Sequence, residues 1–166
     1  MKNPLSRLPR TRSCFVCGVE NPVGLRVHSR VEADGRVVVD YTPREADCGY
    51  RGIVHGGIVK TLLDEAMTWA ALLESDRLCV AAELTTRLLK PAAPGVPLRV
   101  EARVTAAGRI LKVEGAAIDA AGGVAARATG KYMPMPDTLL AACEQDFLPG
   151  PDLEAWQARR KRRAGG

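Results

Sequence analysis

Residues 51–73 form the longest stretch of the chain in which apolar side chains recur on every side of an expected helix. A helix that is apolar all round is typical of a buried position. The stretch is too short for a membrane span and carries charged residues within it. The pattern therefore predicts a long helix at the centre of a core, beginning at the glycine pair that follows His55. Its apolar residues are Ile58, Val59, Leu62, Leu63, Ala66, Met67, Trp69, Ala70, Ala71, Leu72 and Leu73.

After Ser75 the pattern changes, and apolar and polar residues alternate with a period of two, which is typical of strands with one buried face. Short turns rich in proline and glycine separate four such runs. A shorter alternation and a second run lie before the helix, joined by an Asp34-Gly35 hairpin turn. The six runs cover about 25–31, 36–42, 80–88, 98–104, 110–119 and 124–133.

An antiparallel sheet has to bury one face, and the helix is the only element apolar enough to cover it. We therefore expect an α+β fold in which a curved antiparallel sheet of about five to six strands wraps one long central helix. Residues 43–55 are expected to form an irregular loop that leads into this helix, a position where loops often carry function.

The length of 166 residues fits one domain with flanking ends. Residues 1–13 contain four basic and no acidic residues, and we expect a disordered basic N-terminus there. The domain itself is expected to cover 14–136. Residues 137–166 are interpreted as a C-terminal extension, in which Asp152 could cap a short helix through Trp156. Its basic tail, Arg159 to Arg163, is expected to be solvated and frayed.

The net charge of +5 comes from the two ends, because the segment between them carries more acidic than basic residues. Such a distribution does not favour a nucleic-acid interface. The sequence shows no signal-peptide pattern and no run long enough to span a membrane. We therefore expect a cytoplasmic protein without nucleic-acid or membrane partners.

Five cysteines, an odd number, do not indicate a disulfide framework. Cys14-x-x-Cys17 permits a zinc site with His28 or Cys48 as further ligands, but structural zinc sites normally bring a second close pair. The favoured interpretation is that these cysteines pack in the core. We accordingly expect no metal and no other cofactor.

One face of the predicted helix carries small and polar residues at helical spacing: Gly57, Thr61, Asp64 and Thr68. A buried carboxylate without a partner is costly. Asp64 either pairs with Lys60 one turn earlier or takes part in chemistry, and the residues alone leave both open.

The geometry of a helix limits how this face can act, because Gly57 and Asp64 lie about 10 Å apart along its axis. One small reacting group cannot touch both within one chain. Two antiparallel copies related by a twofold axis would bring Gly57 of one copy near Asp64 of the other. A catalytic site on this face is therefore expected to be shared between subunits.

The stretch Gly52-x-x-His55-Gly56-Gly57-x-x-x-x-Leu62-x-Asp64-x-Ala66 resembles the acyl-CoA thioesterase superfamily of hotdog proteins, in its phenylacetyl-CoA-thioesterase-like branch. Residues 14–25 (CFVCGVENPVGL) and the segment from Glu83-Leu84-Thr85 to Lys90-Pro91 are also similar to that superfamily. The resemblance covers about residues 14–135. It implies the hotdog fold and an enzyme that hydrolyses an acyl-CoA thioester to the free acid and CoA.

The resemblance also implies roles for individual residues. The thioester carbonyl would bind the backbone N–H of Gly57, and Asp64 of the neighbouring subunit would act as general base or nucleophile. His55 would shape the glycine turn. Gly49 and Ala81 stand where many members carry Asn or Gln and Ser or Thr, respectively. The implied partners are acyl-CoA and the protein itself, as a homodimer or a dimer of dimers.

Further residues are candidates for substrate binding because of their placement near the loop, the helix start or the end of a strand. Lys and Arg side chains suit the phosphates of CoA. The candidates are Gly56, Tyr50, Arg51, Thr61, Thr68, Arg87 and Lys90.

Two other functions remain open at this point. One is a hotdog dehydratase or hydratase, which needs a histidine paired with an acid, and the chain contains only His28 and His55. The other is a non-catalytic sensor that binds acyl-CoA.

Overall fold

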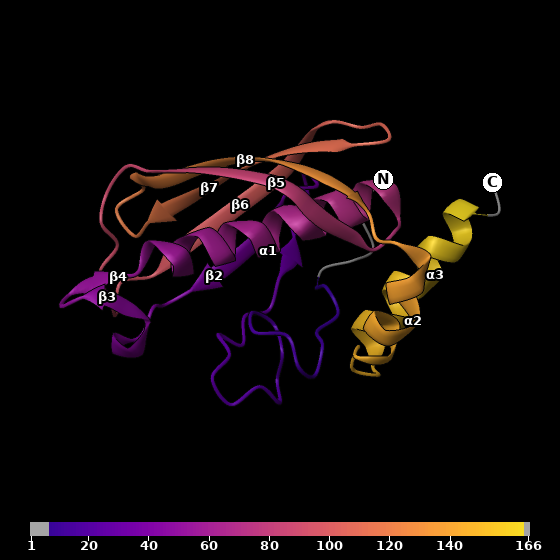
Figure 1. Ribbon diagram of the computed structural model, residues 1–166, viewed down its shortest axis with the longest axis horizontal. Coiled ribbons are helices and arrows are strands. Elements are labelled where there is room, and N and C mark those ends of the chain that lie inside the picture. Colours follow the sequence, from indigo (N-terminus) through magenta and orange to yellow (C-terminus); the bar gives the residue numbers. More distant parts are fainter. Residues whose placement is uncertain (1–6, 165–166) are drawn as a thin grey trace.

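The computed structural model describes residues 7–164 and shows one long helix lying along a twisted sheet (Figure 1). Six strands form this sheet, all neighbours antiparallel, in the order β1-β2-β6-β7-β8-β5. The strands are β1 (Arg30–Val31), β2 (Val37–Tyr41), β5 (Cys79–Leu88), β6 (Leu98–Ala106), β7 (Leu111–Asp119) and β8 (Val124–Pro134).

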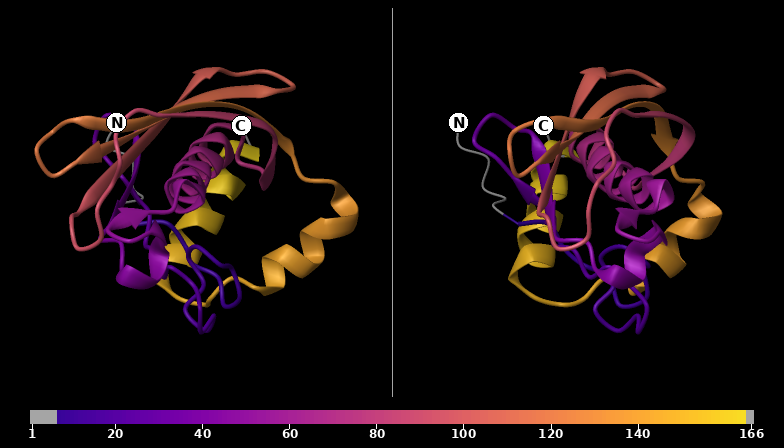
Figure 2. Two further views of the ribbon diagram at one scale, coloured as in Figure 1. Left: turned by 60° about the vertical axis from the view of Figure 1, so that its left-hand side comes forward. Right: turned by 90° about the vertical axis from the view of Figure 1, so that its left-hand side faces the viewer.

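The central helix α1 (Gly56–Ser75) packs against the inner face of the sheet, which arches over it (Figure 2). Its buried residues include Leu62, Leu63, Ala66 and Met67, and they meet inward-facing valines, leucines and alanines of the strands. The α+β fold and the predicted central helix are confirmed.

The four long strands after the helix are also confirmed, whereas the first strand is much shorter than the alternation over 25–31 predicts. Arg26 has a positive φ of 56°, which interrupts the extended backbone. Leu25 and Val27 instead donate their amides to Phe15 and Val16 of the N-terminal loop. Their side chains are buried all the same, so the apolar pattern indicated burial correctly but not strand pairing.

The segment expected to be an irregular loop contains regular structure. A short 3-10 helix (Glu45–Asp47) leads into a small hairpin of β3 (Cys48–Tyr50) and β4 (Ile53–Val54). Asp47 is buried and accepts hydrogen bonds from Tyr41 (2.5 Å) and Arg44 (2.8 Å), and its backbone carbonyl accepts from the amide of His55 (2.8 Å). These bonds hold the hairpin against the start of α1.

Part of the N-terminal segment packs on the domain, in contrast to the expected disorder of residues 1–13. Leu8 is fully buried, and its amide donates to the carbonyl of Ser29 (3.0 Å). Thr11 forms an isolated bridge with Phe147. Residues 1–6 lie outside the described residues.

The C-terminal extension forms two helices beside the C-terminal end of α1 (Figures 1 and 2). The first, α2 (Asp137–Gln145), was not predicted, whereas α3 (Pro151–Ala164) contains the helix predicted from Asp152. An aromatic cluster of Trp69, Phe147 and Trp156 joins the extension to α1, with ring centroids 5.2–6.3 Å apart.

Two arginines of the basic tail bind the protein and are not solvated as expected. Arg159 donates to the backbone carbonyl of Leu73 (2.6 Å), and Arg160 donates to that of Asp76 (3.0 Å). Carbonyl groups at the end of a helix have no partners within it, which explains their affinity for cations. No helix in the described part of the chain is long and apolar enough to cross a membrane.

Candidate functional site

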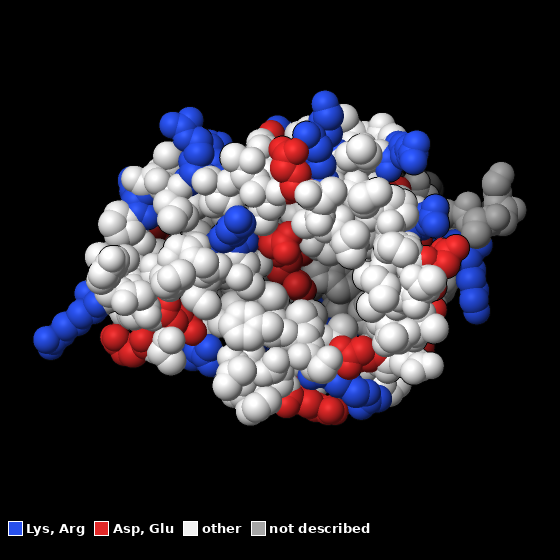
Figure 3. All heavy atoms as spheres, viewed as in Figure 1, with Lys and Arg blue, Asp and Glu red and all other residues white. Residues whose placement is uncertain are grey.

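Asp64 lies midway along α1, and a residue of the sheet binds its carboxylate. The hydroxyl group of Tyr132, on β8, donates to Oδ1 of Asp64 (2.8 Å). Viewed as in Figure 1, acidic side chains lie in a hollow over the middle of α1 (Figure 3). Lys60, the other candidate partner, forms no ion pair with Asp64 in the described structure. The carboxylate is thus bonded without a neutralising cation, which leaves it available as a base.

Tyr132 was missed by the sequence interpretation, although a buried tyrosine usually needs a partner for its hydroxyl group. The residue is fully buried. Burial and the adjacent charge of Asp64 raise its pKa well above the usual range, while a hydrogen bond with Thr68 acts in the opposite direction. The phenol therefore stays protonated and donates to Asp64.

The start of α1 carries the amides that were expected to bind a carbonyl oxygen. His55 is the N-cap residue, and its Nδ1 accepts the N–H of Gly57 (2.9 Å). The amide of Ile58 donates to the His55 carbonyl (2.9 Å). Among the described residues, the amide of Gly56 has no hydrogen-bond partner. The sequence did not indicate that the Gly57 amide is bound by the histidine of its own turn.

The imidazole of His55 also explains the glycine at position 49. A Cβ on Gly49 would lie 2.8 Å from Cδ2 of His55, which is too close. The histidine ring thus occupies the space in which a longer side chain at 49 would begin. Tyr50 and Arg51 follow at the tip of the β3–β4 hairpin, where both are exposed.

The remaining candidates lie in different surroundings. Thr61 and Thr68 are half-buried on α1, and Thr68 is the one that reaches Tyr132. Arg87 is exposed on β5, directly opposite Arg127. Lys90 lies 3.9 Å from the carboxylate of Asp119, at the end of β7. Asp64 and Thr68 therefore share Tyr132 as a hydrogen-bond partner, whereas Lys90 is not brought to these residues.

Thr86 on β5 is a further candidate that was not predicted. Its hydroxyl oxygen is buried and has no hydrogen-bond partner within the described structure. It pairs with Ala128, a buried residue, and therefore faces the helix side of the sheet. Two residues further on, the side chain of Leu88 lies against Gly56 at the start of α1. An alternating strand alone does not show which threonine faces the helix.

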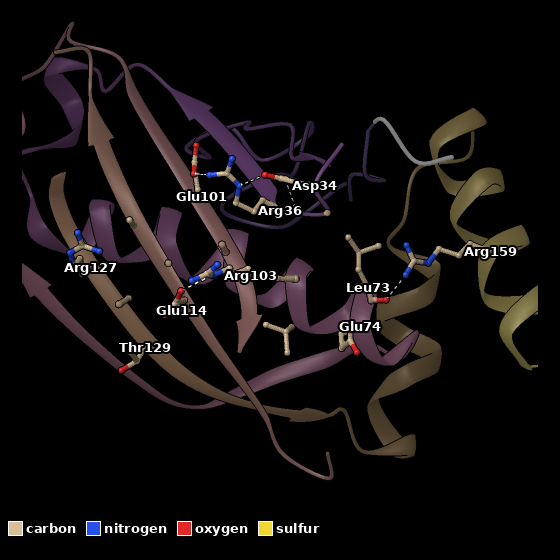
Figure 4. Close-up of a pocket in the computed structure, with 17 residues that line it drawn as sticks. Asp34, Arg36, Leu73, Glu74, Glu101, Arg103, Glu114, Arg127, Thr129 and Arg159 are labelled. Atoms are coloured by element: carbon tan, nitrogen blue, oxygen red, sulfur yellow. Dashed lines mark hydrogen bonds and ion pairs between the residues drawn. The ribbon is translucent and has the colours of Figure 1, made fainter. Parts of the chain in front are cut away.

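A further hollow lies elsewhere on the molecule. It measures about 790 Å³ and lies at the C-terminal end of α1 and along β6, β7 and β8 (Figure 4). Its charged side chains are largely paired with each other, as in Arg103–Glu114 (2.7 Å) and Arg36–Glu101. None of the predicted site residues lines it. We do not assign the thioester chemistry to this hollow.

The conceivable zinc ligands are separated by the fold. His28 Nε2 bonds the Leu8 carbonyl (3.0 Å), and Cys48 lies beside Glu45. Cys14 and Cys17 instead meet Glu65 of α1. Burial and the nearby thiol of Cys14 raise the pKa of Glu65 to about 7.

Residues 51–126, which include the start of α1 and Asp64, match the family model of the thioesterase superfamily. Over this segment, from the β3–β4 hairpin to β8, the chain is similar to thioesterase superfamily proteins. Among curated proteins, no sequence matches the chain significantly.

Several solved structures share the arrangement. Protein RHA08564 is 28% identical with a TM-score of 0.67, and the match covers 74% of this chain and 60% of that one. The E. coli PaaI protein from the phenylacetic acid degradation operon is 23% identical (TM-score 0.61; 68% and 81% covered). A protein of Streptococcus mutans, smu.793, was solved with acetyl-CoA and is 22% identical (TM-score 0.57; 60% and 81% covered). The last two likenesses show the hotdog fold alone, which confirms the predicted architecture.

Proposed function

We propose that this protein hydrolyses an acyl-CoA thioester to the free acid and CoA. The match of residues 51–126 to the thioesterase superfamily model supports a thioester hydrolase. The similar structure that was solved with acetyl-CoA supports the acyl-CoA class of substrate. The observation that carries the proposal is the carboxylate of Asp64 in the middle of α1, which Tyr132 orients and which forms no ion pair with a cation among the described residues.

In the proposed reaction, Asp64 takes a proton from water, whose oxygen attacks the thioester carbonyl carbon. Direct attack by the carboxylate, followed by hydrolysis of the anhydride, is the nucleophilic variant. In both, the C–S bond breaks and the sulfur of CoA leaves as a thiolate that takes up a proton. The thioester oxygen replaces Nδ1 of His55 on the amide of Gly57, at the positive end of α1. Such a donor typically stabilises the developing oxyanion by about 3 kcal/mol.

The site is proposed to be shared between two subunits, because Gly57 and Asp64 are separated along one helix by about 10 Å. The edge strand β5 supports this assembly, since it is the last strand of the sheet and most of its residues are exposed. Large apolar residues near its end are also exposed, among them Tyr50, Ile53, Leu88 and Leu89. Unpaired edges associate readily. A twofold axis between two β5 strands would set two copies of α1 antiparallel and side by side.

A thiol-release assay over short, medium, long and aromatic acyl-CoAs tests the activity. We expect turnover by the wild type and its loss in Asp64→Asn, with affinity for the acyl-CoA retained. If Asp64→Asn hydrolyses as fast as the wild type, the proposed chemistry is wrong. If the wild type binds acyl-CoA without any turnover, the protein is a sensor.

A mixed dimer tests whether the site is shared. One chain carries Asp64→Asn and the other carries Gly57→Pro, which removes the amide at a position in the first helical turn where proline is tolerated. A shared site leaves one of the two centres intact and about half of the wild-type activity. A site within one chain leaves almost none. The controls are the two homodimers in which both chains carry the same substitution, Asp64→Asn or Gly57→Pro.

A further inference from the structure

Two cysteines and a glutamate come together where the N-terminal loop crosses α1. The Sγ atoms of Cys14 and Cys17 and a carboxylate oxygen of Glu65 all lie within 4.8 Å of one another. Cys17 is buried, and the other two are half-buried. Glu65 lies about fifty residues after the two cysteines in the sequence. The thioester reaction proposed above uses none of the three residues.

The loop that carries the cysteines is built around the sulfur of Cys14. The amide of Val16 points at Sγ of Cys14 (3.3 Å), and the amide of Gly18 donates to the Cys14 carbonyl (2.9 Å). A Cβ on Gly18 would lie 2.2 Å from that carbonyl oxygen, so the turn needs glycine. Backbone N–H groups directed at sulfur favour its thiolate form, and the thiolate is the form that binds metals.

The carboxylate of Glu65 is oriented from its other side. The indole Nε1 of Trp69, one turn later, donates to Oε1 of Glu65 (3.0 Å). Within the described structure, Glu65 forms no ion pair with lysine or arginine. An outer partner that holds one oxygen of a ligating carboxylate is typical of metal sites in proteins.

We propose that Cys14, Cys17 and Glu65 bind one divalent transition-metal ion, for which Zn²⁺ fits best. Two thiolates and one carboxylate form a donor set that suits zinc, and three protein ligands leave the fourth tetrahedral position to water. Binding replaces the thiol protons, which pass to solvent. The ion would fix the N-terminal loop to the helix that carries Asp64. The sequence interpretation was that the cysteines pack in the core. The proposed site differs because its third ligand, Glu65, comes from α1.

Cobalt provides a direct test, because thiolate-bound tetrahedral Co²⁺ has a charge-transfer band and intense visible bands. The full-length protein is reduced, stripped with a chelator and titrated with Co²⁺ and then Zn²⁺. We expect one Co²⁺ per chain with the thiolate bands, and its displacement by Zn²⁺. Cys17→Ser and Glu65→Gln should weaken binding by more than about a hundredfold, since losing an outer partner alone costs about 10–100-fold.

The matched controls are Cys48→Ser and Cys143→Ser, which change half-exposed cysteines outside the cluster and should bind Co²⁺ like the wild type. Circular dichroism checks that each variant is folded. As a second readout, Zn²⁺ should slow the reaction of Cys14 and Cys17 with a thiol reagent, followed by mass spectrometry. If the reduced wild type takes up no Co²⁺, or if folded Cys17→Ser and Glu65→Gln bind it equally well, the proposal is overturned. Formation of a Cys14–Cys17 disulfide without metal uptake by the reduced protein overturns it as well.

Discussion

Tyr132 is the residue that decides the orientation of Asp64. Its hydroxyl group bonds Oδ1 of Asp64 from β8, on the sheet side of α1. The other carboxylate oxygen has no such partner in the described hydrogen bonds, and in the proposed reaction it accepts the proton of water. Tyr132 is thus a positioning residue, not a group that touches the substrate.

Replacing Tyr132 by phenylalanine tests this role. Tyr132→Phe should lower kcat about tenfold, equivalent to about 1.4 kcal/mol, with KM little changed. The loss of one hydrogen bond should also cost about 1 kcal/mol of unfolding free energy. Thiol-release kinetics and urea unfolding measure the two effects. The control is Thr105→Val, which removes an exposed hydroxyl group on β6 that donates to the carbonyl of Lys112. An unchanged kcat in Tyr132→Phe would exclude the positioning role.

His55 is assigned a structural role at the start of α1, where its Nδ1 caps the amide of Gly57. His55→Ala removes this cap and should lower the unfolding free energy by about 1 kcal/mol. Because the amide is then free for the thioester, kcat should change by less than about tenfold. Urea unfolding and thiol release check this. A folded His55→Ala protein with kcat reduced by several orders of magnitude would instead make His55 a group that transfers protons.

At the scale of elements, the C-terminal extension closes the end of the central helix. Arg159 donates to the carbonyl of Leu73 and to Oδ1 of Asp76 (3.2 Å), the residue with left-handed backbone that follows α1. A cation at this end of a helix also interacts favourably with its dipole. The basic tail therefore contributes to the fold through its first residues.

This contribution can be measured with Arg159→Met. The variant loses the bonds to Leu73 and Asp76 and should have an unfolding free energy lower by about 1–2 kcal/mol. Arg162→Met, at an exposed position of the same helix, is the matched control and should have little effect. Urea unfolding of both variants compares them directly. Equal destabilisation by the two would mean that the capping bonds contribute nothing.

At the scale of the whole molecule, the proposed enzyme depends on pairing two chains along β5. Leu89→Glu places a charge among the exposed apolar residues at the end of this strand and should shift the protein toward monomers. Activity should fall in parallel, because each centre needs both chains. Light scattering and thiol release at matched concentrations measure the two quantities.

Ile110→Glu is the control for this experiment, since Ile110 is similarly exposed but lies in the turn between β6 and β7. It should leave both assembly and activity unchanged. A monomeric Leu89→Glu protein with full activity would exclude a shared site.

The elements with the clearest repeats were predicted from sequence. The apolar residues from Ile58 to Leu73 recur all round a helix, and those after Ser75 alternate with a period of two. His55 and the glycine pair marked the start of the helix. Such signals are local, so residues close in sequence are enough to show them. The packing of Leu8, the β3–β4 hairpin and α2 have no comparable repeat and were missed.

The sequence by itself determined the α+β architecture and the residues of the polar helix face, because backbone geometry places neighbours three and four residues apart on one side of a helix. Only the tertiary structure decided what those residues meet. Tyr132 reaches Asp64 from a strand 68 residues later, and Glu65 meets Cys14 and Cys17 from about fifty residues away. These contacts depend on how the sheet and the N-terminal loop pack on α1. A local repeat in the sequence does not predict such packing.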